Sequence, residues 1–319
     1  MATFLLEVGT EELPASFVAD ALRQWETKIP ANLTALGLTA TLHTYGTPRR
    51  LAVVLTDLPD RQPDRELAVK GPALAAAFGN GDPQGEPTKA AIGFAKAQGV
   101  TTADLVVRDT EKGPCVFALR QEVGRPTAEV LTELAPQWVL GLEGKRLMRW
   151  GHGDLKFPRP IRWLVGLLDD QVLPIALEGL KAGRQTWGHR VLAPGPVLLD
   201  RPADYLPRLR EAGVLADVNE RRERICQQMT GVAELMGATV EVLPDLLAEV
   251  VHLVEFPTAV VGEFDREFLK LPEPAIVMEM VVHQRYFPVY DRGTPRAFCP
   301  ISSQFPTATR PSPNRLPRA

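Results

Sequence analysis

The residues with the clearest chemical potential lie between Lys145 and Arg190. Six cationic side chains occur before Trp163, against one acid, Asp154, although the formal net charge of the protein is -3. The six cations are Lys145, Arg146, Arg149, Lys156, Arg159 and Arg162. Guanidinium groups bind phosphates through paired hydrogen bonds. The segment is therefore a candidate binding surface for the phosphates of a nucleic acid.

Aromatic residues alternate with these cations. Trp150 follows Arg149, Trp163 follows Arg162, and Trp187 is followed by His189 and Arg190. Flat rings beside guanidinium groups stack on bases, so Trp150, His189 and Arg190 join the candidate contacts. A second interpretation stays open, because basic clusters are weak motifs: the tryptophans are core anchors, and the arginines are solvated or paired with acids elsewhere.

A smaller candidate site is the turn Gly46–Arg50. Pro48 restricts the backbone there and two adjacent arginines, Arg49 and Arg50, stand at the start of a predicted strand. The pair could clamp a phosphate. The alternative is a hairpin with solvated charges.

Motifs of a self-sufficient enzyme are not found. The sequence contains no G-x-S-x-G, no H-E-x-x-H and no phosphate-binding loop, and its five histidines have no ligand spacing. The glycines at 79, 81 and 85 do not form a nucleotide fingerprint. We therefore predict no catalytic, metal or cofactor site in this chain, although a general acid–base role for one histidine stays open.

Composition narrows the class of protein. The 319 residues are 45% hydrophobic and 24% charged, which is typical of a globular protein of about two domains. A pI of about 6.0 argues against a general nucleic-acid-coating protein, so a polyanion would have to bind a local patch. We expect no DNA partner. Three distant cysteines favour a reducing cytoplasm, and no apolar window is long enough for a membrane helix.

The periodicity of apolar residues predicts a multi-domain α+β fold with mixed sheets and packed helices. It begins with a strand at 3–8, a helix that Pro30 ends, and strands at 39–45 and 51–56. The first domain comprises 1–62 and resumes at 143–200 with the basic and aromatic stretch. A small α+β domain at 63–142 is predicted as an insertion.

The remaining chain divides into two parts. Residues 201–293 are predicted to form a helix-rich α+β domain, in which Asp217 begins a helix and Arg221 lies off its buried stripe. Residues 294–319 are rich in Pro, Arg and Ser, and this composition predicts a disordered tail.

In order along the chain, several motifs together resemble the beta subunit of the bacterial tetrameric glycyl-tRNA synthetase. The matching segments are LLEVGTEELP at 5–14, TPRRLAV at 47–53, KGPALAAAFG at 70–79, PTKAAIGFA at 87–95, MRWG at 148–151, FPRPIRWLVGLL at 157–168, GHRVL at 188–192, LLAEVVHLVEFPTAVVGEFDREFLKLP at 246–272 and HQRYFPVYD at 283–291. The resemblance covers nearly the whole chain up to Asp291.

This resemblance implies a partner role. In that family the alpha subunit holds the catalytic core, with ATP and magnesium, and joins the beta subunit in an alpha2beta2 heterotetramer that binds tRNA(Gly). The family's beta chain also continues through an HD-like domain and an anticodon-binding domain. We therefore expect the segment from Thr294 to be a truncated or frame-shifted end.

Three functions follow as alternatives. The first is a non-catalytic part of a glycine–tRNA ligase that supports tRNA binding and assembly with the alpha subunit. The second is an assembly scaffold whose basic stretch pairs with acids of the partner, without contacting tRNA. The third is a hydrolytic editing module, for which the sequence shows no water-activating group.

Overall fold

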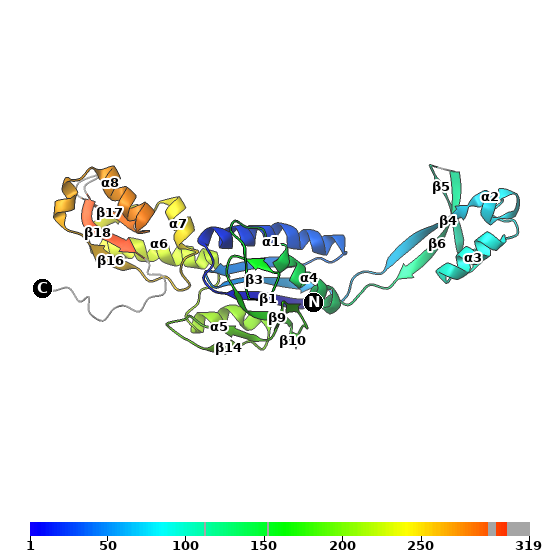
Figure 1. The fold of residues 1–319 in the computed structure, drawn as a ribbon, viewed down its shortest axis with the longest axis horizontal. Coiled ribbons are helices and arrows are strands. Elements are labelled where there is room, and N and C mark those ends of the chain that lie inside the picture. The colour runs from blue at the N-terminus through cyan, green and yellow to red at the C-terminus, as the bar shows by residue number, and fades with distance from the viewer. Residues whose placement is uncertain (112, 152, 293–297, 305–319) are drawn as a thin grey trace. The chain divides into compact units, whose positions relative to one another are not determined.

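The computed structural model describes residues 1–111, 113–151, 153–292 and 298–304. The fold is α+β, as predicted, with helices beside several antiparallel sheets. The chain forms two compact units (Figure 1). The first comprises Met1–Asp60 and Ala128–Ala319, and the second comprises Arg61–Thr127.

A five-stranded antiparallel sheet forms the centre of the first unit, in the order β10-β9-β1-β3-β2. Its strands are β1 (Ala2–Thr10), β2 (Thr41–Thr47), β3 (Arg50–Leu58), β9 (Ile161–Leu168) and β10 (Gln171–Val172). Side chains alternate between the faces of a strand. Phe4, Leu6 and Val8 therefore enter one core, while Leu5 packs in the other.

Two helices cover the first face: α1 (Ala15–Ala35) and α4 (Thr127–Leu140). They are joined by a hydrogen bond of 2.9 Å from Trp25 Nε1 to the carbonyl oxygen of Trp138. The prediction that Pro30 ends the first helix is wrong. Leu33 continues the buried stripe beyond the proline, and its burial offsets the hydrogen bond that proline removes.

The second face packs against α5 (Tyr205–Glu211), which follows a single turn at Pro202–Asp204. Tyr205 and Leu209 from this helix contact the core that contains Leu5 and Val165. Short hairpins surround the sheet. They are β7 (Met148–Arg149) with β8 (Lys156–Phe157), β11 (Ala176–Leu177) with β12 (Leu180–Lys181), and β13 (Gln185–Trp187) with β14 (Pro196–Leu198).

The helix-rich part contains α6 (Val218–Leu235), α7 (Pro244–Val250), α8 (Glu273–Met278) and single turns at Arg266–Lys270 and Glu279–His283. Asp217 begins α6 as predicted, and its carboxylate accepts the amide protons of Asn219 and Glu220. Arg221, however, is fully buried and not off the stripe. Its guanidinium stays in the interior because backbone carbonyls surround it.

A four-stranded sheet completes this part in the order β15-β17-β18-β16. Its strands are β15 (Ala238–Val240), β16 (Val260–Glu263), β17 (Phe287–Asp291) and β18 (Phe298–Gln304). Strand β18 falls in the predicted disordered tail, so that prediction is wrong for these residues. Its backbone pairs with strands on both sides, which satisfies its polar groups. Of the predicted tail, the structure describes the backbone of β18. The other residues of that tail, 294–297 and 305–319, lie outside the described residues.

The second unit has a three-stranded sheet, β4-β6-β5, with β4 (Arg65–Ala73), β5 (Leu105–Thr110) and β6 (Gly113–Glu122). Helices α2 (Leu74–Ala77) and α3 (Lys89–Gln98) and short turns at Gly79–Gly81 and Thr102–Asp104 accompany it. The insertion was predicted at 63–142, but α4 belongs to the first unit. Leu131 and Trp138 of α4 lie in the core of the central sheet.

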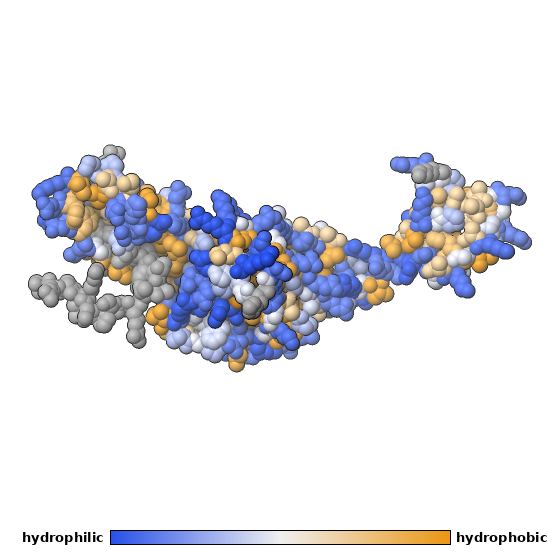
Figure 2. All heavy atoms as spheres, viewed as in Figure 1, coloured by the Kyte–Doolittle hydropathy of each residue, from blue (hydrophilic) through white to orange (hydrophobic). Residues whose placement is uncertain are grey.

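Within the part of the chain that the structure describes, no helix has both the length and the hydropathy needed to cross a membrane. Figure 2 shows hydrophilic residues gathered on the viewed face of the first unit. The distribution of charge within this unit decides which cations are available to a ligand.

Candidate nucleic-acid interface

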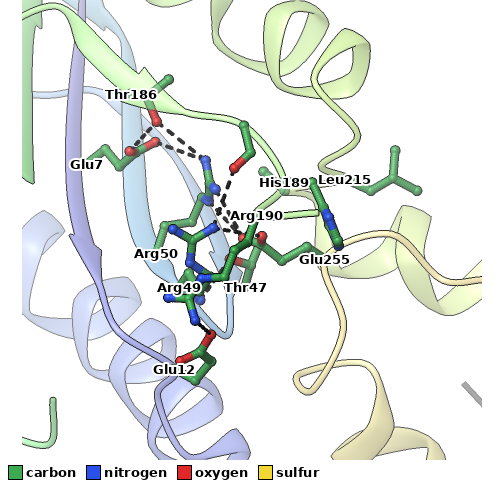
Figure 3. Close-up of polar contacts among 12 residues, drawn as sticks. Glu7, Glu12, Thr47, Arg49, Arg50, Thr186, His189, Arg190, Leu215 and Glu255 are labelled. Carbon is green, nitrogen blue, oxygen red and sulfur yellow. Dashed lines mark hydrogen bonds and ion pairs between the residues drawn. The ribbon is translucent and has the colours of Figure 1, made fainter. Parts of the chain in front are cut away.

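Arg50 lies inside a buried network on the second face of the central sheet (Figure 3). Its Nη2 is 3.1 Å from Glu255 Oε1, and its Nη1 is 4.0 Å from Glu7 Oε2. The Nη1 group also donates to Thr186 Oγ1 at 3.4 Å. The predicted phosphate contact by Arg50 is wrong, because its guanidinium is fully buried and already paired with two carboxylates.

Trp163 fits against this network because its cross-strand partner is Gly9. A Cβ on Gly9 would lie 1.8 Å from Trp163 Cε2, so a side chain there would displace the indole. The indole Nε1 donates to Glu7 Oε1. The guanidinium carbons of Arg49 and Arg50 lie 5.7 and 5.8 Å from the ring centroid. Trp163 is therefore a structural anchor in this network.

Glu255 approaches the network from the segment after α7. Its Oε1 accepts a hydrogen bond of 2.8 Å from Thr47, and its Oε2 lies 3.7 Å from Arg49 Nη1. Burial alone would raise the pKa of Glu255, but the charges of Arg50 and Arg49 outweigh burial and lower that pKa. Burial alone would likewise lower the pKa of Arg50, while Glu255 and Glu7 raise it. The buried pair is ionised.

His189 and Arg190 are also committed to contacts within the chain. His189 is buried, and its Nδ1 accepts the amide protons of Val191 at 3.2 Å and Leu192 at 3.0 Å. Burial is the largest cause that lowers the pKa of His189, so the ring is neutral at pH 7. Arg190 lies 2.6 Å from both Glu11 Oε2 and Glu12 Oε1.

The charges of this region cancel. Arg162 Nε lies 3.5 Å from Glu11 Oε1, which adds a fourth arginine to the group. We call the group the neutral arginine cluster; its members are Arg49, Arg50, Arg162 and Arg190 with Glu7, Glu11, Glu12 and Glu255. Four positive and four negative side chains leave no excess charge for a polyanion.

The remaining predicted cations lie in a different setting, around the hairpin β7–β8. Arg149 and Lys156 are direct cross-strand partners, and both are exposed. Like charges that face each other across a hairpin are destabilising. Asp154 lies 3.5 Å from Arg149, in an ion pair whose side chains are 92% and 62% exposed. An ion pair this exposed contributes little to the stability of the fold.

Three further cations flank this hairpin and are exposed: Lys145, Arg146 and Arg159. Arg146 has a φ of 60°, in the left-handed region, and Arg159 donates to the carbonyl oxygen of Pro158 at 2.9 Å. We call the five cations of segment 145–160 the basic hairpin. Asp154 is the one acid in that segment, so the basic hairpin carries an excess of positive charge.

Trp150 is half-buried beside the basic hairpin. Its Nε1 donates to the carbonyl oxygen of Phe157 at 2.8 Å. The indole borders an open groove of about 660 Å³, which also contains Ile161 and Leu177. One hydrogen bond thus fixes the ring with part of its surface towards a cavity.

The predicted set is therefore divided between two places. Arg49, Arg50, Arg162 and Arg190 belong to the neutral arginine cluster, and His189 interacts with it electrostatically. By contrast, the basic hairpin is formed by Lys145, Arg146, Arg149, Lys156 and Arg159. Sequence reasoning missed the acids that pair with the first group. The sequence contains a signal for a buried acid at Glu7, because a charge interrupts an apolar strand there. It contains no such signal at Glu255.

The described residues contain no group of three or more His, Cys, Asp or Glu side chains that could hold a metal ion. Contacts within the chain thus distinguish the basic hairpin, which carries excess positive charge, from a charge-balanced cluster whose centre, Arg50 with Glu7 and Glu255, is buried. Of these two, the basic hairpin is the one with unbalanced positive charge for a large polyanion.

Comparison with known proteins agrees with the motifs. The family model described as "Glycyl-tRNA synthetase beta subunit" matches residues 4–305. The chain is 52% identical over 294 residues to the glycine–tRNA ligase beta subunit of Acaryochloris marina, covering 91% of this chain and 41% of that protein. The corresponding protein of Gloeothece citriformis is 48% identical over 320 residues, covering 99% and 44%.

A more distant relative shows the same relationship. The beta subunit of Desulforamulus reducens is 46% identical over 287 residues, covering 90% of this chain and 41% of that protein. The chain thus spans about two fifths of the length of these curated relatives. With a family match that covers residues 4–305 and identities near one half, the chain belongs to the glycyl-tRNA synthetase beta subunit family.

Proposed function

We propose that this chain is a non-catalytic part of a glycine–tRNA ligase beta subunit that supports the binding of tRNA(Gly). Family membership over residues 4–305 supports the assignment to this enzyme. The observation that best supports direct contact with tRNA is the cross-strand pair of Arg149 and Lys156. Two exposed cations held face to face destabilise the free protein, and a bound phosphate would relieve that repulsion.

The phosphate-binding residues of this proposal are the five cations of the basic hairpin, with Trp150 beside them as an aromatic face. Contacts of this kind position a nucleic acid and do not read its sequence. The neutral arginine cluster holds together three distant parts of the first unit: β1, β3 and the segment at Glu255. Its role in this proposal is structural.

The catalytic steps are assigned to a partner. We infer that the alpha subunit binds ATP and magnesium and attaches glycine to tRNA, in an alpha2beta2 assembly in the cytoplasm. The motif search in this chain supports that division, because the sequence has no phosphate-binding loop. The purified chain is then expected to show no glycine-dependent pyrophosphate exchange.

A scaffold without tRNA contact is the competing function. It requires the basic residues to pair with acids of the partner subunit. In the neutral arginine cluster the acids come from the chain itself, so those arginines need no partner. The basic hairpin is the part of the described chain to which the scaffold alternative still applies.

A titration of tRNA(Gly) at several salt concentrations separates the two functions. Arg149→Ala, Lys156→Ala and Arg159→Ala are each expected to weaken binding. Each should also make the slope of log K against log salt shallower by about 0.7 to 0.9 for every phosphate that its side chain had bound. The matched control is Arg208→Ala, an arginine 54% exposed and paired with Glu211 within α5. It should change neither quantity.

The same variants are then mixed with the alpha subunit. Retained assembly with a shallower salt slope supports the tRNA-binding function. An unchanged salt slope in all three variants, together with weakened assembly, would show that the basic hairpin is a protein interface. Melting temperatures measured first would confirm that each variant is folded.

A further inference from the structure

We propose that the groove beside Trp150 holds an unpaired nucleobase of RNA. This inference rests on the proposed function, because the phosphates of the same RNA segment would lie on the basic hairpin. It adds a distinction that phosphate contacts alone do not supply. The surface would prefer single-stranded RNA to a duplex.

The groove has the size and the lining that a flat ring needs. Its volume is about 660 Å³, and it is open to solvent. Most of its lining is apolar, contributed by Trp150, Leu155, Phe157, Ile161, Leu177 and Leu180. Apolar pockets of this size bind flat organic ligands. An indole at the edge supplies a surface on which a base can stack.

The floor of the groove is preformed. Phe157 and Leu177 are 1% and 4% exposed and belong to the main core of the first unit. The ring of Phe157 packs edge-on against Phe17 with centroids 5.4 Å apart. The hydrogen bond from Trp150 to the Phe157 backbone fixes the wall to this floor. A ligand therefore does not have to order these side chains on binding.

The charged groups of the groove exclude a phosphate from its interior. Glu178 Oε1 accepts the amide protons of Asp154 at 2.9 Å and Leu155 at 2.6 Å, which holds these three lining residues together. The carboxylates of Asp154 and Glu178 both line the groove. They repel an anion, whereas a neutral ring meets apolar surface.

Charge complementarity at the rim favours RNA over an uncharged apolar partner. Lys156 lies between the lining residues Leu155 and Phe157, and Arg159 precedes the lining residue Pro160. Phosphates on either side of an inserted base would reach these exposed cations. A base in a duplex is paired and stacked and cannot enter, so the strand must be single.

The experiment uses the full chain and a short single-stranded RNA that carries the fluorescent base 2-aminopurine. Stacking quenches this fluorophore. We expect binding to quench it further, and we expect the same strand in a duplex, where the base is already stacked and quenched, to bind with no further change in fluorescence. Leu180→Trp fills the groove and should weaken single-strand binding by about tenfold, the contribution of one stacked base. The salt slope should remain, because the phosphate contacts are intact.

Leu198→Trp is the matched control, since Leu198 is 62% exposed on β14 and does not line the groove. It should bind and quench like the parent protein. Trp150→Phe keeps an aromatic wall and should retain most of the quenching. The quenching by the unaltered chain tests the inference even where a variant fails to fold.

The outcomes separate this inference from the proposed function. In one outcome, binding depends on salt, has equal affinity for single strand and duplex, and causes no quenching. The inference about the groove is then wrong, whereas the proposed phosphate binding by the basic hairpin is supported. If the unaltered chain shows no salt-dependent binding of RNA, both this inference and the proposed function are wrong. If Leu180→Trp weakens binding of the alpha subunit and leaves RNA binding unchanged, the groove holds a protein side chain, and the inference is wrong.

Discussion

Arg50 and Glu255 are separated by 205 residues in the chain, yet Arg50 Nη2 lies 3.1 Å from Glu255 Oε1 in the interior of the first unit. Arg50 begins a strand of the central sheet, and Glu255 follows the helix α7 of the helix-rich part. This pair therefore connects the two parts. Its ionised state depends on both partners, because either charge alone would be buried without compensation.

Replacement of Glu255 tests that dependence. We expect Glu255→Ala to lower the free energy of unfolding by about 3–5 kcal/mol, because the variant leaves Arg50 charged and buried without its main partner. Urea unfolding measures the change. The matched control is Glu249→Ala, whose ion pair with Arg285 is about 40% exposed on both sides and should contribute less than about 1 kcal/mol. Equal decreases in the two variants would contradict the buried-pair assignment.

Stability should fall in two separable steps as the pH is lowered. The first involves His252, which is buried and whose pKa is lowered to about 4 by burial and by the charges of Arg221 and Arg222. The unfolded chain binds a proton near pH 6.5, so protonation favours unfolding. Stability from this group is complete above pH 6.5 and is lost as the pH falls towards about 4.

Glu255 governs the second step. Its folded-state pKa is lowered, so its contribution is present above its unfolded pKa, about 4.3, and is lost at lower pH. His252→Gln should flatten the dependence between pH 6.5 and about 4 and leave the acid-side decrease. Urea midpoints measured from about pH 7 to well below pH 4 check both steps. A His252→Gln profile parallel to that of the parent protein would rule out this histidine as the source.

Arg221 holds three segments together through backbone carbonyls. Its Nε donates to Val251 and its Nη1 to Ala216, both at 3.0 Å, and its Nη2 donates to Gly46. Its pKa is lowered to about 10 by burial, so it stays charged at pH 7. We expect Arg221→Lys to lower the free energy of unfolding by about 3 kcal/mol, because one ammonium group cannot replace the planar set of donors.

Arg222→Lys is the control for that substitution. Arg222 is exposed and donates to Asn219 in the same helix, so its replacement should change stability by less than about 0.5 kcal/mol. Chemical denaturation of the two variants side by side measures the difference. Similar stabilities would show that the buried hydrogen bonds contribute little.

Two glycine substitutions should change stability in opposite directions. Gly9→Ala places a Cβ 1.8 Å from the indole of Trp163 and should destabilise the first unit by about 1–3 kcal/mol. Gly93 lies in α3 of the second unit, with nothing within 4 Å of an added Cβ, so Gly93→Ala should stabilise that unit by about 0.5–1 kcal/mol. Amide hydrogen exchange of β1 and of α3 reports each change separately.

The order of elements was largely readable from the sequence. The short β-rich run of β1 and the three- and four-residue spacing from Phe17 to Ile29 reflect local backbone preferences, which neighbouring residues encode. The cap at Asp217 is local in the same way. The end of α1 and the strand β18 could not be predicted, because burial of Leu33 and pairing with β16 and β17 depend on distant residues.

The same distinction between local and distant residues applies to the candidate site. By itself, the sequence determined that cations and tryptophans concentrate between Lys145 and Arg190 and that the motifs belong to one family. Only the tertiary structure decided that Arg50 is paired and buried whereas Arg149 is exposed opposite Lys156. The reason is physical: a charge is neutralised by whichever acid lies within a few ångströms, and for Arg50 that acid is 205 residues away.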